Sequence, residues 1–247
     1  GNSSPSTPYT ANKAGKGPAW SNSLFEDNAE FGYGMLLAQQ AIRDGLKAKV
    51  EEVAANENAT AEVKAACQEW LDTFGVGATN GAATDKLVAA LENVDCPTCK
   101  DIVKNKDFLA KKSQWIFGGD GWAYDIGFNG VDHVLASGKD INIMVFNTEV
   151  YSNTGGQSSK ATPTGAVAQF AAGGKEVKQK DLAAIAMSYG YVYVAQISMG
   201  ADMNQTIKAI AEAEAYPGPS LIIAYAPCIN HGIKKGMAKA QTEEKLA

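Results

Sequence analysis

Four short apolar runs in the second half of the chain constrain its fold more than any other feature. They read SQWIF, INIMVF, YVYVAQI and SLIIAYA, and each is nearly continuous in apolar residues. Helical patterns over residues 122–137, 181–189 and 202–215 separate these runs. Short strands that are apolar on both faces and alternate with helices are typical of a parallel sheet covered on both sides. We therefore expect an α/β fold with a doubly wound, mainly parallel sheet.

The first half of the chain has a different pattern. Residues 1–23 are rich in Ser, Thr, Pro, Gly and Asn, which predicts an irregular arm. Apolar residues at helical spacing then run from Glu26 to about Asn56 and predict one long amphipathic helix, with Gly45 as the place for a bend. Three more helical patterns follow over residues 59–74, 84–93 and 100–111.

These patterns predict a helical insertion at about 47–112 that is rich in charged residues and has no catalytic constellation. The chain has 247 residues, of which 45% are hydrophobic, and this is enough for the core of one α/β unit. We therefore expect residues 1–247 to form a single domain that consists of the irregular arm, the sheet and the helical insertion.

Charge and composition exclude several classes of function. The net charge is −5 and the lysines are spread along the chain, so no basic patch for nucleic acid is expected. No apolar stretch approaches the roughly 18 to 20 residues of a membrane helix. The first residues, GNSSPSTPYT, lack the pattern of a signal peptide. We expect a cytoplasmic protein with no nucleic-acid partner and no membrane segment.

The cysteines are too few for a disulfide scaffold and suit a reducing compartment. Cys96-Pro97-Thr98-Cys99 has the spacing of a metal knuckle, but no second pair or histidine stands near it. Structural thiols are therefore the favoured interpretation of this pair, with a metal or redox role as the alternative. The four cysteines are Cys67, Cys96, Cys99 and Cys228.

The stretch FGGDGWAYDIG, residues 117–127, follows the first apolar run and opens a helix. In a doubly wound sheet, ligands bind outside the carboxyl ends of the strands. Glycines leave room for a ligand beside the backbone, and a helix N-terminus favours a phosphate. Asp120 would repel a phosphate unless a divalent cation lay between them, and Mg²⁺ commonly joins carboxylates to phosphates. Asp120 is therefore a candidate metal ligand, with a helix N-cap as the alternative.

A second stretch, NTEVYSNTGGQ, begins a long loop from Asn147 to Lys180 that is rich in Gly, Ser and Thr. A loop of this length in a compact domain is usually functional. Asn147-Thr148 comes one helix and one strand after Asp120, at the neighbouring strand end. This arrangement resembles the thiamine-diphosphate motif, in which GDG and a later Asn-containing pair hold Mg²⁺ and the diphosphate.

The resemblance covers residues 7–46 and 113–240. It includes GKGPAWSNSLFEDNAEFGYGM, the stretch from KSQWIFGGDG to FAAGGK, YGYVYVAQISMG and PGPSLIIAYAPCINHG. These residues resemble the C-terminal thiamine-binding domain of pyruvate:ferredoxin (flavodoxin) oxidoreductases. The resemblance implies oxidative decarboxylation of pyruvate with coenzyme A to acetyl-CoA and CO₂. Electrons would leave through iron–sulfur clusters to ferredoxin or flavodoxin, in a full-length homodimer of the cytoplasm or of an anaerobic organelle.

The resemblance also implies site residues. Mg²⁺ would be held by the Asp120 carboxylate, the Thr148 hydroxyl and the Val150 carbonyl, which are all hard oxygen ligands. Thr148 stands where many thiamine enzymes have a second Asn. Asn153 matches the catalytically important asparagine of the family, with a plain turn residue as the alternative. The residues that would wrap the diphosphate are Gly119, Asp120, Gly121, Trp122, Thr148, Glu149, Val150, Tyr151, Ser152 and Asn153.

Cys228, in YAPCINHG just past the last apolar run, matches the last thiolate ligand of the 4Fe–4S cluster nearest thiamine in this family. A lone cysteine at such a place is otherwise a small apolar residue. Another family ligand lies in a Gly-Cys-Ser-Ser stretch that aligns with GNSS at the start of this chain, so Asn2 would replace it. We therefore expect this cluster only in the full-length enzyme. His133 and His231 are not assigned to the site.

Two alternatives stay open from the sequence. The chain could be a catalytically silent interaction module that keeps the fold, or part of a related oxidoreductase that acts on a different 2-oxoacid. In the resembling family, another domain supplies the glutamate that activates the thiamine aminopyrimidine. We therefore expect the chain to be inactive by itself and to need the remaining domains of the enzyme as partners, along with pyruvate, coenzyme A and ferredoxin or flavodoxin.

Overall fold

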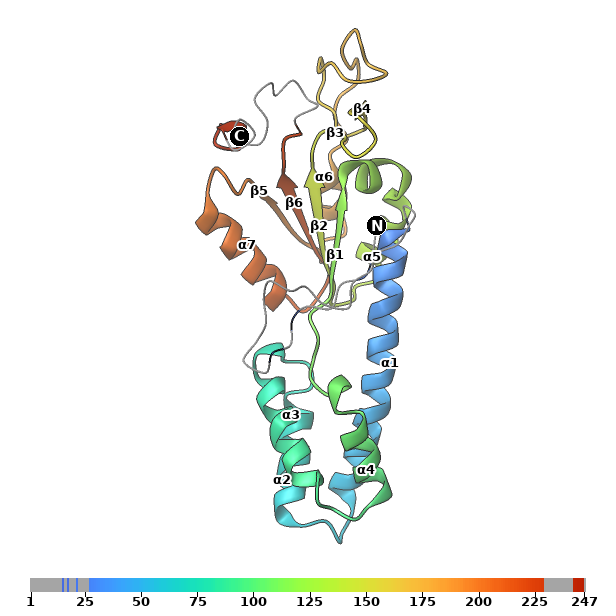
Figure 1. Ribbon diagram of the computed structural model, residues 1–247, viewed down its shortest axis with the longest axis vertical. Coiled ribbons are helices and arrows are strands. Elements are labelled where there is room, and N and C mark those ends of the chain that lie inside the picture. Colours follow the sequence, from blue (N-terminus) through green and yellow to red (C-terminus); the bar gives the residue numbers. More distant parts are fainter. Residues whose placement is uncertain (1–14, 16, 18–20, 22–26, 229–241, 247) are drawn as a thin grey trace. The chain divides into compact units, whose positions relative to one another are not determined.

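The computed structural model describes residues 15, 17, 21, 27–228 and 242–246 (Figure 1). The chain divides into two compact units. One, the sheet unit, comprises residues 1–33 and 114–247, and the other, the helical unit, comprises residues 34–113. The sequence pattern predicts a helical insertion at about 47–112. The helical unit is larger because it also takes in most of the first long helix.

The sheet unit is built on four parallel strands, labelled β1, β2, β5 and β6 in Figure 1. Their spatial order is β1-β2-β6-β5. The predicted parallel α/β sheet is confirmed, and each strand overlaps one of the four apolar runs. The strands are β1 (Trp115–Gly119), β2 (Asn142–Asn147), β5 (Tyr193–Ile197) and β6 (Ser220–Tyr225).

Both faces of the sheet are buried at its centre. Ile143 of β2 and Leu221 of β6 point to one face, and Met144 and Ile222 point to the other, because successive side chains of a strand alternate. All four are buried, at 0–8% exposed. Helix α7 (Met203–Ala215) packs through its alanines on the face that carries Met144 and Ile222. The near-continuous apolar composition of these strands follows from this double burial.

Helices join the strands, as expected, but the first of them differs from its prediction. Instead of one helix over residues 122–137, a π-helical turn (Gly121–Ile126) is followed by α5 (Phe128–Ala136). The π turn directly follows Asp120, at the predicted site, and such turns are frequent at functional sites. The helix before β5 is short, α6 (Leu182–Met187), and Asp181 caps its first turn by accepting a hydrogen bond from the Ala184 amide.

The long loop after β2 contains a small hairpin of its own. Strands β3 (Val150–Tyr151) and β4 (Gln157–Ser158) pair antiparallel. The turn between them includes Gly155 and Gly156, whose φ angles of +117° and +85° suit glycine. The hairpin therefore fixes the backbone of the NTEVYSNTGGQ stretch immediately after the second strand of the sheet.

The helical unit contains the helices predicted in the first half of the chain. Helix α1 runs without interruption from the sheet unit into the helical unit, and Gly45 lies in its interior. Helix α3 begins seven residues earlier than the pattern over 84–93 predicted, since Gly77 and Gly81 weaken the helical signal there. None of the helices in the described parts of the chain is long and apolar enough to cross a membrane. The helices are α1 (Asn28–Ala55), α2 (Ala61–Asp72), α3 (Gly77–Leu91), α4 (Pro97–Lys104) and the 3₁₀ turn η1 (Lys106–Phe108).

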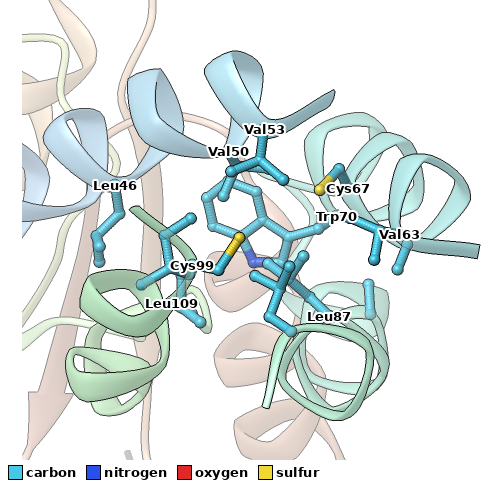
Figure 2. Close-up of a cluster of buried hydrophobic side chains, with 13 residues drawn as sticks. Leu46, Val50, Val53, Val63, Cys67, Trp70, Leu87, Cys99 and Leu109 are labelled. Atoms are coloured by element: carbon cyan, nitrogen blue, oxygen red, sulfur yellow. The ribbon is translucent and has the colours of Figure 1, made fainter. Parts of the chain in front are cut away.

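Trp70 lies in the core of the helical unit and is fully buried (Figure 2). Its indole Nε1 donates a hydrogen bond to Thr84 Oγ1 at 3.2 Å, so the one polar atom of the ring is paired. Two cysteines, Cys67 of α2 and Cys99 of α4, enter the same cluster. Other members are Leu46, Val50, Val53, Val63, Leu87, Ile102 and Leu109.

Candidate functional site

The predicted ligands meet at the carboxyl edge of the sheet. β1 ends at Gly119 and pairs with β2, where Gly119 lies opposite Phe146. Asp120 follows the first strand and Thr148 follows the second, so the parallel register brings the two residues to neighbouring strand ends.

Three oxygen atoms converge at this edge. The Thr148 hydroxyl oxygen lies 2.7 Å from Asp120 Oδ1 and 2.8 Å from the backbone carbonyl oxygen of Val150. Ser152 Oγ donates to the same Thr148 oxygen at 2.6 Å. A hydroxyl has only one proton to donate. Thr148 can therefore donate to the carboxylate or to the carbonyl but not to both, and Ser152 Oγ, 3.4 Å from the Val150 carbonyl oxygen, is a second donor within reach of that carbonyl.

The spacing of these oxygens fits a small, hard cation. In an octahedral site with metal–oxygen distances of 2.0–2.1 Å, adjacent ligands stand about 2.8–3.0 Å apart. The two oxygen–oxygen distances at Thr148 are 2.7 and 2.8 Å. A carboxylate, a hydroxyl and a carbonyl are the oxygen ligands that Mg²⁺ accepts. The two distances at Thr148 therefore come within about 0.1–0.3 Å of the spacing of adjacent ligands in such a site.

Asp120 is a buried carboxyl group. It is only 1% exposed, and its second oxygen, Oδ2, accepts a hydrogen bond from Ser159 Oγ at 2.6 Å. Burial raises its pKa above the ordinary value, and the hydrogen bonds from Ser159 and Thr148 oppose that rise. Among the residues that the structure describes, no lysine or arginine forms an ion pair with it. Its carboxylate is therefore held by hydroxyl donors alone among the described side chains.

The negative charge of Asp120 also shifts the pKa values of neighbouring groups. Burial, followed by repulsion from Asp120, raises the pKa of the Glu149 carboxyl group. The pKa of the Tyr124 hydroxyl is raised above its usual range, first by burial and then by Asp120. Glu149 also has a φ of +64°, which is strained for a residue with a side chain. This strained position turns the backbone so that the Thr148 hydroxyl and the Val150 carbonyl face the same point.

The glycines around Asp120 have different roles. A Cβ at Gly118 would lie 2.2 Å from the Trp122 ring, and a Cβ at Gly121 would lie 2.3 Å from the Tyr151 ring. Both glycines are therefore required by packing within the protein. A Cβ at Gly119 would meet no protein atom within 4 Å, and this residue is exposed. Gly119 is the glycine that leaves open space beside the backbone for a ligand.

Trp122 supplies a second indication of a ligand. Its side chain is only 4% exposed, and its indole Nε1 finds no hydrogen-bond acceptor in the described part of the chain. An indole N–H donates only, and a buried donor without a partner costs free energy. Trp122 lies in the first turn after Asp120, where backbone amides also lack helical partners. These donors suit an anionic ligand.

Asn153 lies in the turn between β3 and β4 and is exposed. Its neighbours hold the turn, since Thr154 Oγ1 donates to Gln157 Oε1 at 2.6 Å and Gln157 Nε2 donates to the Thr154 carbonyl at 2.9 Å. Its side chain is therefore open to solvent. The turn interpretation also holds for its backbone, so its catalytic role stays a prediction.

A cavity of about 510 Å³ adjoins the site at the same sheet edge. Asn147 and Glu149 line it, and Asp120, Thr148 and Val150 do not. Its other walls come from the segment that leads into α6 and from the ends of β5 and β6, among them Lys180, Ser198 and Tyr225. The cavity therefore lies beside the Asp120, Thr148 and Val150 oxygens and not around them.

Other residues considered from the sequence lie elsewhere. Cys228 follows the end of β6 and is half-buried. His133 of α5 is exposed and sets its ring edge-on to Tyr33, with centroids 5.8 Å apart. Asn2 and His231 lie outside the described residues.

Sequence reasoning missed Ser159, which donates to Asp120. It lies in an irregular loop where no periodicity or motif marks one serine among several. It also missed the strained backbone of Glu149, which no residue type or spacing in the sequence marks. Strained conformations of this kind cluster at functional sites.

The chain matches a known domain family. The family described as "Thiamine pyrophosphate enzyme, C-terminal TPP binding domain" matches residues 103–224. This range contains every residue of the oxygen cluster and of the glycine motif.

Curated relatives match over the whole chain. It is 57% identical to a pyruvate-flavodoxin oxidoreductase of Klebsiella pneumoniae, in an alignment that covers 100% of this chain and 21% of that protein. It is 56% identical to a pyruvate:ferredoxin oxidoreductase of Moorella thermoacetica, with coverages of 100% and 21%. It is 49% identical to a mitochondrial pyruvate dehydrogenase (NADP⁺) of Euglena gracilis, with coverages of 97% and 13%. The chain spans about a fifth of the length of its bacterial relatives.

Proposed function

Because the chain belongs to the family of pyruvate:ferredoxin (flavodoxin) oxidoreductases, we propose that it binds the diphosphate of thiamine diphosphate through Mg²⁺. Asp120, Thr148 and the Val150 carbonyl would hold the metal ion. The amides around Gly119 and Gly121, the Trp122 indole and the loop over residues 148–153 would hold the diphosphate. Within the whole enzyme, this chain would supply one half of the thiamine site.

The observation that carries the proposal is the convergence of hard oxygen atoms beside the buried carboxylate of Asp120. The Thr148 hydroxyl oxygen lies 2.7 Å from Asp120 Oδ1 and 2.8 Å from the Val150 carbonyl oxygen. A divalent cation satisfies all three oxygens together and compensates the buried charge of Asp120. It also makes room for the diphosphate, which the carboxylate would otherwise repel.

We propose that the whole enzyme decarboxylates pyruvate and passes the acetyl group to coenzyme A. Thiamine diphosphate, when bound, supplies a carbanion that adds to the substrate carbonyl and an electron sink for the decarboxylation. In this chain, Asn153 would act by donating a hydrogen bond from its amide to the polar oxygen of the reacting molecule. Asn153 is exposed in the β3–β4 turn, three residues after Val150, and this position supports that role.

Electron transfer is assigned to the whole enzyme rather than to this chain. We propose that Cys228 is one ligand of a 4Fe–4S cluster whose other ligands lie elsewhere in the enzyme. The partners would be the other domains, a second copy of the enzyme in a homodimer, and ferredoxin or flavodoxin, in the cytoplasm or an anaerobic organelle. The relative from Euglena gracilis is named for NADP⁺. A chain of this kind therefore occurs with different acceptors, so the acceptor depends on other domains.

Calorimetry of the chain tests the metal bridge. Thiamine diphosphate is titrated into the chain with Mg²⁺, and again with excess chelator. We expect binding in the first titration only, because Asp120 repels the diphosphate when no cation lies between them. Asp120→Asn should remove the Mg²⁺-dependent heat, since the amide keeps the size of the side chain but not its charge.

Asp132→Asn is the matched control. Asp132 lies on α5 and accepts a hydrogen bond from Tyr189 Oη at 2.7 Å, which the amide oxygen can still accept. This variant makes the same change of charge away from the oxygen cluster and should bind as the unmodified chain does. Equal binding with and without chelator, or binding by Asp120→Asn, would overturn the assignment of the metal site.

A further inference from the structure

The Cys96-Pro97-Thr98-Cys99 pair lies in the helical unit and takes no part in the proposed thiamine site. Cys96 is the N-cap of α4, and Pro97 and Thr98 form its first turn. All four cysteines of the chain are free thiols in the structure. The pair therefore stands as a dithiol at the beginning of a helix.

The backbone brings the two sulfur atoms together. Cys96 has extended φ and ψ of −135° and 129°, and its Sγ accepts a hydrogen bond from the Cys99 amide at 3.4 Å. Residues three apart in a helical turn have Cβ atoms about 5–6 Å apart, and a disulfide needs a Cβ separation of about 3.5–4.5 Å. A disulfide therefore requires the two side chains to close by about 1–2 Å, and Cys96 lies at the N-cap, outside the regular turns of α4, where the backbone can make this shift.

The two thiols differ in the way that a nucleophile and a resolving thiol must. Cys96 is half-buried, and hydrogen bonds from Cys99 lower its pKa. Cys99 is 2% exposed, and burial raises its pKa to about 12. An attacking cysteine works as an accessible thiolate, and helix N-termini favour that form. The second cysteine is kept protonated and away from solvent until the first has reacted.

A metal site is the competing interpretation of this spacing, but the surroundings do not support it. A structural zinc needs four ligands. The described part of the chain contains no group of three His, Cys, Asp or Glu side chains that could hold a metal ion. The nearest acidic side chain in the sequence, Asp95, is paired with Lys100. Cys67 lies in the buried core, and burial raises its pKa to about 11.

We propose that Cys96 and Cys99 form a redox-active dithiol that a small disulfide, such as glutathione disulfide, converts reversibly into an intramolecular disulfide. The Cys96 thiolate attacks one sulfur of glutathione disulfide and releases one glutathione thiolate, which takes up a proton. Cys99 then loses its proton, attacks the Cys96 sulfur and releases the second glutathione. The pair loses two electrons and two protons, and the two sulfurs of the oxidant are reduced.

Mass spectrometry of the folded chain after equilibration in glutathione redox buffers tests the site. We expect the loss of two of the four thiols, a disulfide-linked peptide that joins Cys96 to Cys99, and full recovery with dithiothreitol. In the reduced chain at pH 7, Cys96 should react with iodoacetamide about tenfold or more faster than Cys67. Their thiolate fractions differ by at least about a hundredfold, and the greater nucleophilicity of a high-pKa thiolate offsets part of this.

Two variants separate the steps. Cys96→Ser keeps an N-cap side chain, so α4 should stay folded, but no disulfide should form. Cys99→Ala should stop at a mixed disulfide between Cys96 and glutathione. Cys67→Ala is the matched control and should still form the Cys96–Cys99 bond. A disulfide mapped to another pair, no oxidation in the unmodified chain, or equal alkylation of Cys96 and Cys67 would overturn the proposal.

Discussion

The three glycines of the GGDG motif should respond differently to one added methyl group. At Gly121, the Cβ of alanine would lie 2.3 Å from Cε1 of Tyr151, whereas ordinary contact begins near 3.4 Å, so the ring must move by about 1 Å. At Gly118 the corresponding distance to the Trp122 ring is 2.2 Å. Overpacking of this kind costs about 1–3 kcal/mol. At Gly119 the methyl group would meet no protein atom within 4 Å.

Gly119→Ala should therefore leave the free energy of unfolding within about 1 kcal/mol of the unmodified chain, with a neutral or stabilising sign. It should nevertheless weaken Mg²⁺-dependent binding of thiamine diphosphate at least about tenfold, which is about 1.4 kcal/mol. The reason is that the methyl group fills the space where the diphosphate approaches the backbone. Gly118→Ala and Gly121→Ala should destabilise the fold and weaken binding together, because Tyr151 directly follows Val150, whose carbonyl faces the metal site.

Urea unfolding measures the first quantity and titration calorimetry measures the second, on the same four proteins. A Gly119→Ala variant that binds as tightly as the unmodified chain would refute the placement of the diphosphate beside Gly119. A Gly119→Ala variant that is destabilised as much as Gly121→Ala would refute the packing analysis itself.

Four further predictions concern the site and the chain. Asp120→Asn should stabilise the metal-free chain at pH 7. A carboxyl group whose pKa is raised on folding favours the folded state below its unfolded pKa, and this contribution is lost as the pH rises through the folded pKa. The neutral amide of asparagine removes this loss of stability at pH 7. Urea midpoints at pH 5 and 7 measure this, and a lower midpoint for the variant at pH 7 would contradict it. Thr148→Val keeps the shape of the side chain but removes the shared hydroxyl, so Mg²⁺-dependent binding should fall at least about tenfold; unchanged affinity in calorimetry would remove Thr148 from the ligand set. The purified chain should be colourless and contain no stoichiometric iron, because Cys67 and Cys99 are buried in the helical core and cannot join Cys228; iron analysis with about four irons per chain would show otherwise. The chain alone should release CO₂ from pyruvate no faster than free thiamine diphosphate, because the carboxylate that activates the aminopyrimidine comes from another domain in the family; steady release that Asn153→Ala abolishes would show a complete active site.

The sheet could be predicted from the sequence because its strands are buried on both faces. The run INIMVF needs no alternation because Ile143 and Met144 are both covered, so its continuous apolar composition predicted a strand of a parallel sheet covered on both sides. The boundaries of α3 were less accessible, since glycines at its start remove the helical pattern while packing of the later turns still holds the helix.

The site was predictable only in part. Asp120 and Thr148 stand after two neighbouring strands, and topology alone brings such residues together. The π turn after Asp120 was not predictable, because one inserted residue in a helical turn leaves the hydrophobic period almost unchanged. The role of Ser159 was also hidden, since its contact with Asp120 depends on how an irregular loop folds back over the strand end.

The unliganded oxygen cluster is costly for the chain, and that cost explains why binding should be strongly linked to stability. Burial raises the pKa of both Asp120 and Glu149, and the hydroxyl of Thr148 cannot satisfy two acceptors. A ligand that binds only the folded state stabilises it by RT ln(1 + [L]/Kd), which is about 2.7 kcal/mol at a hundredfold excess over Kd. For a chain of this length, that corresponds to a rise of about 5–11 °C in Tm. Because the cation removes the conflict among these oxygens, this rise should require Mg²⁺ and the diphosphate together, and it should disappear in Asp120→Asn even though that variant starts from a more stable metal-free state.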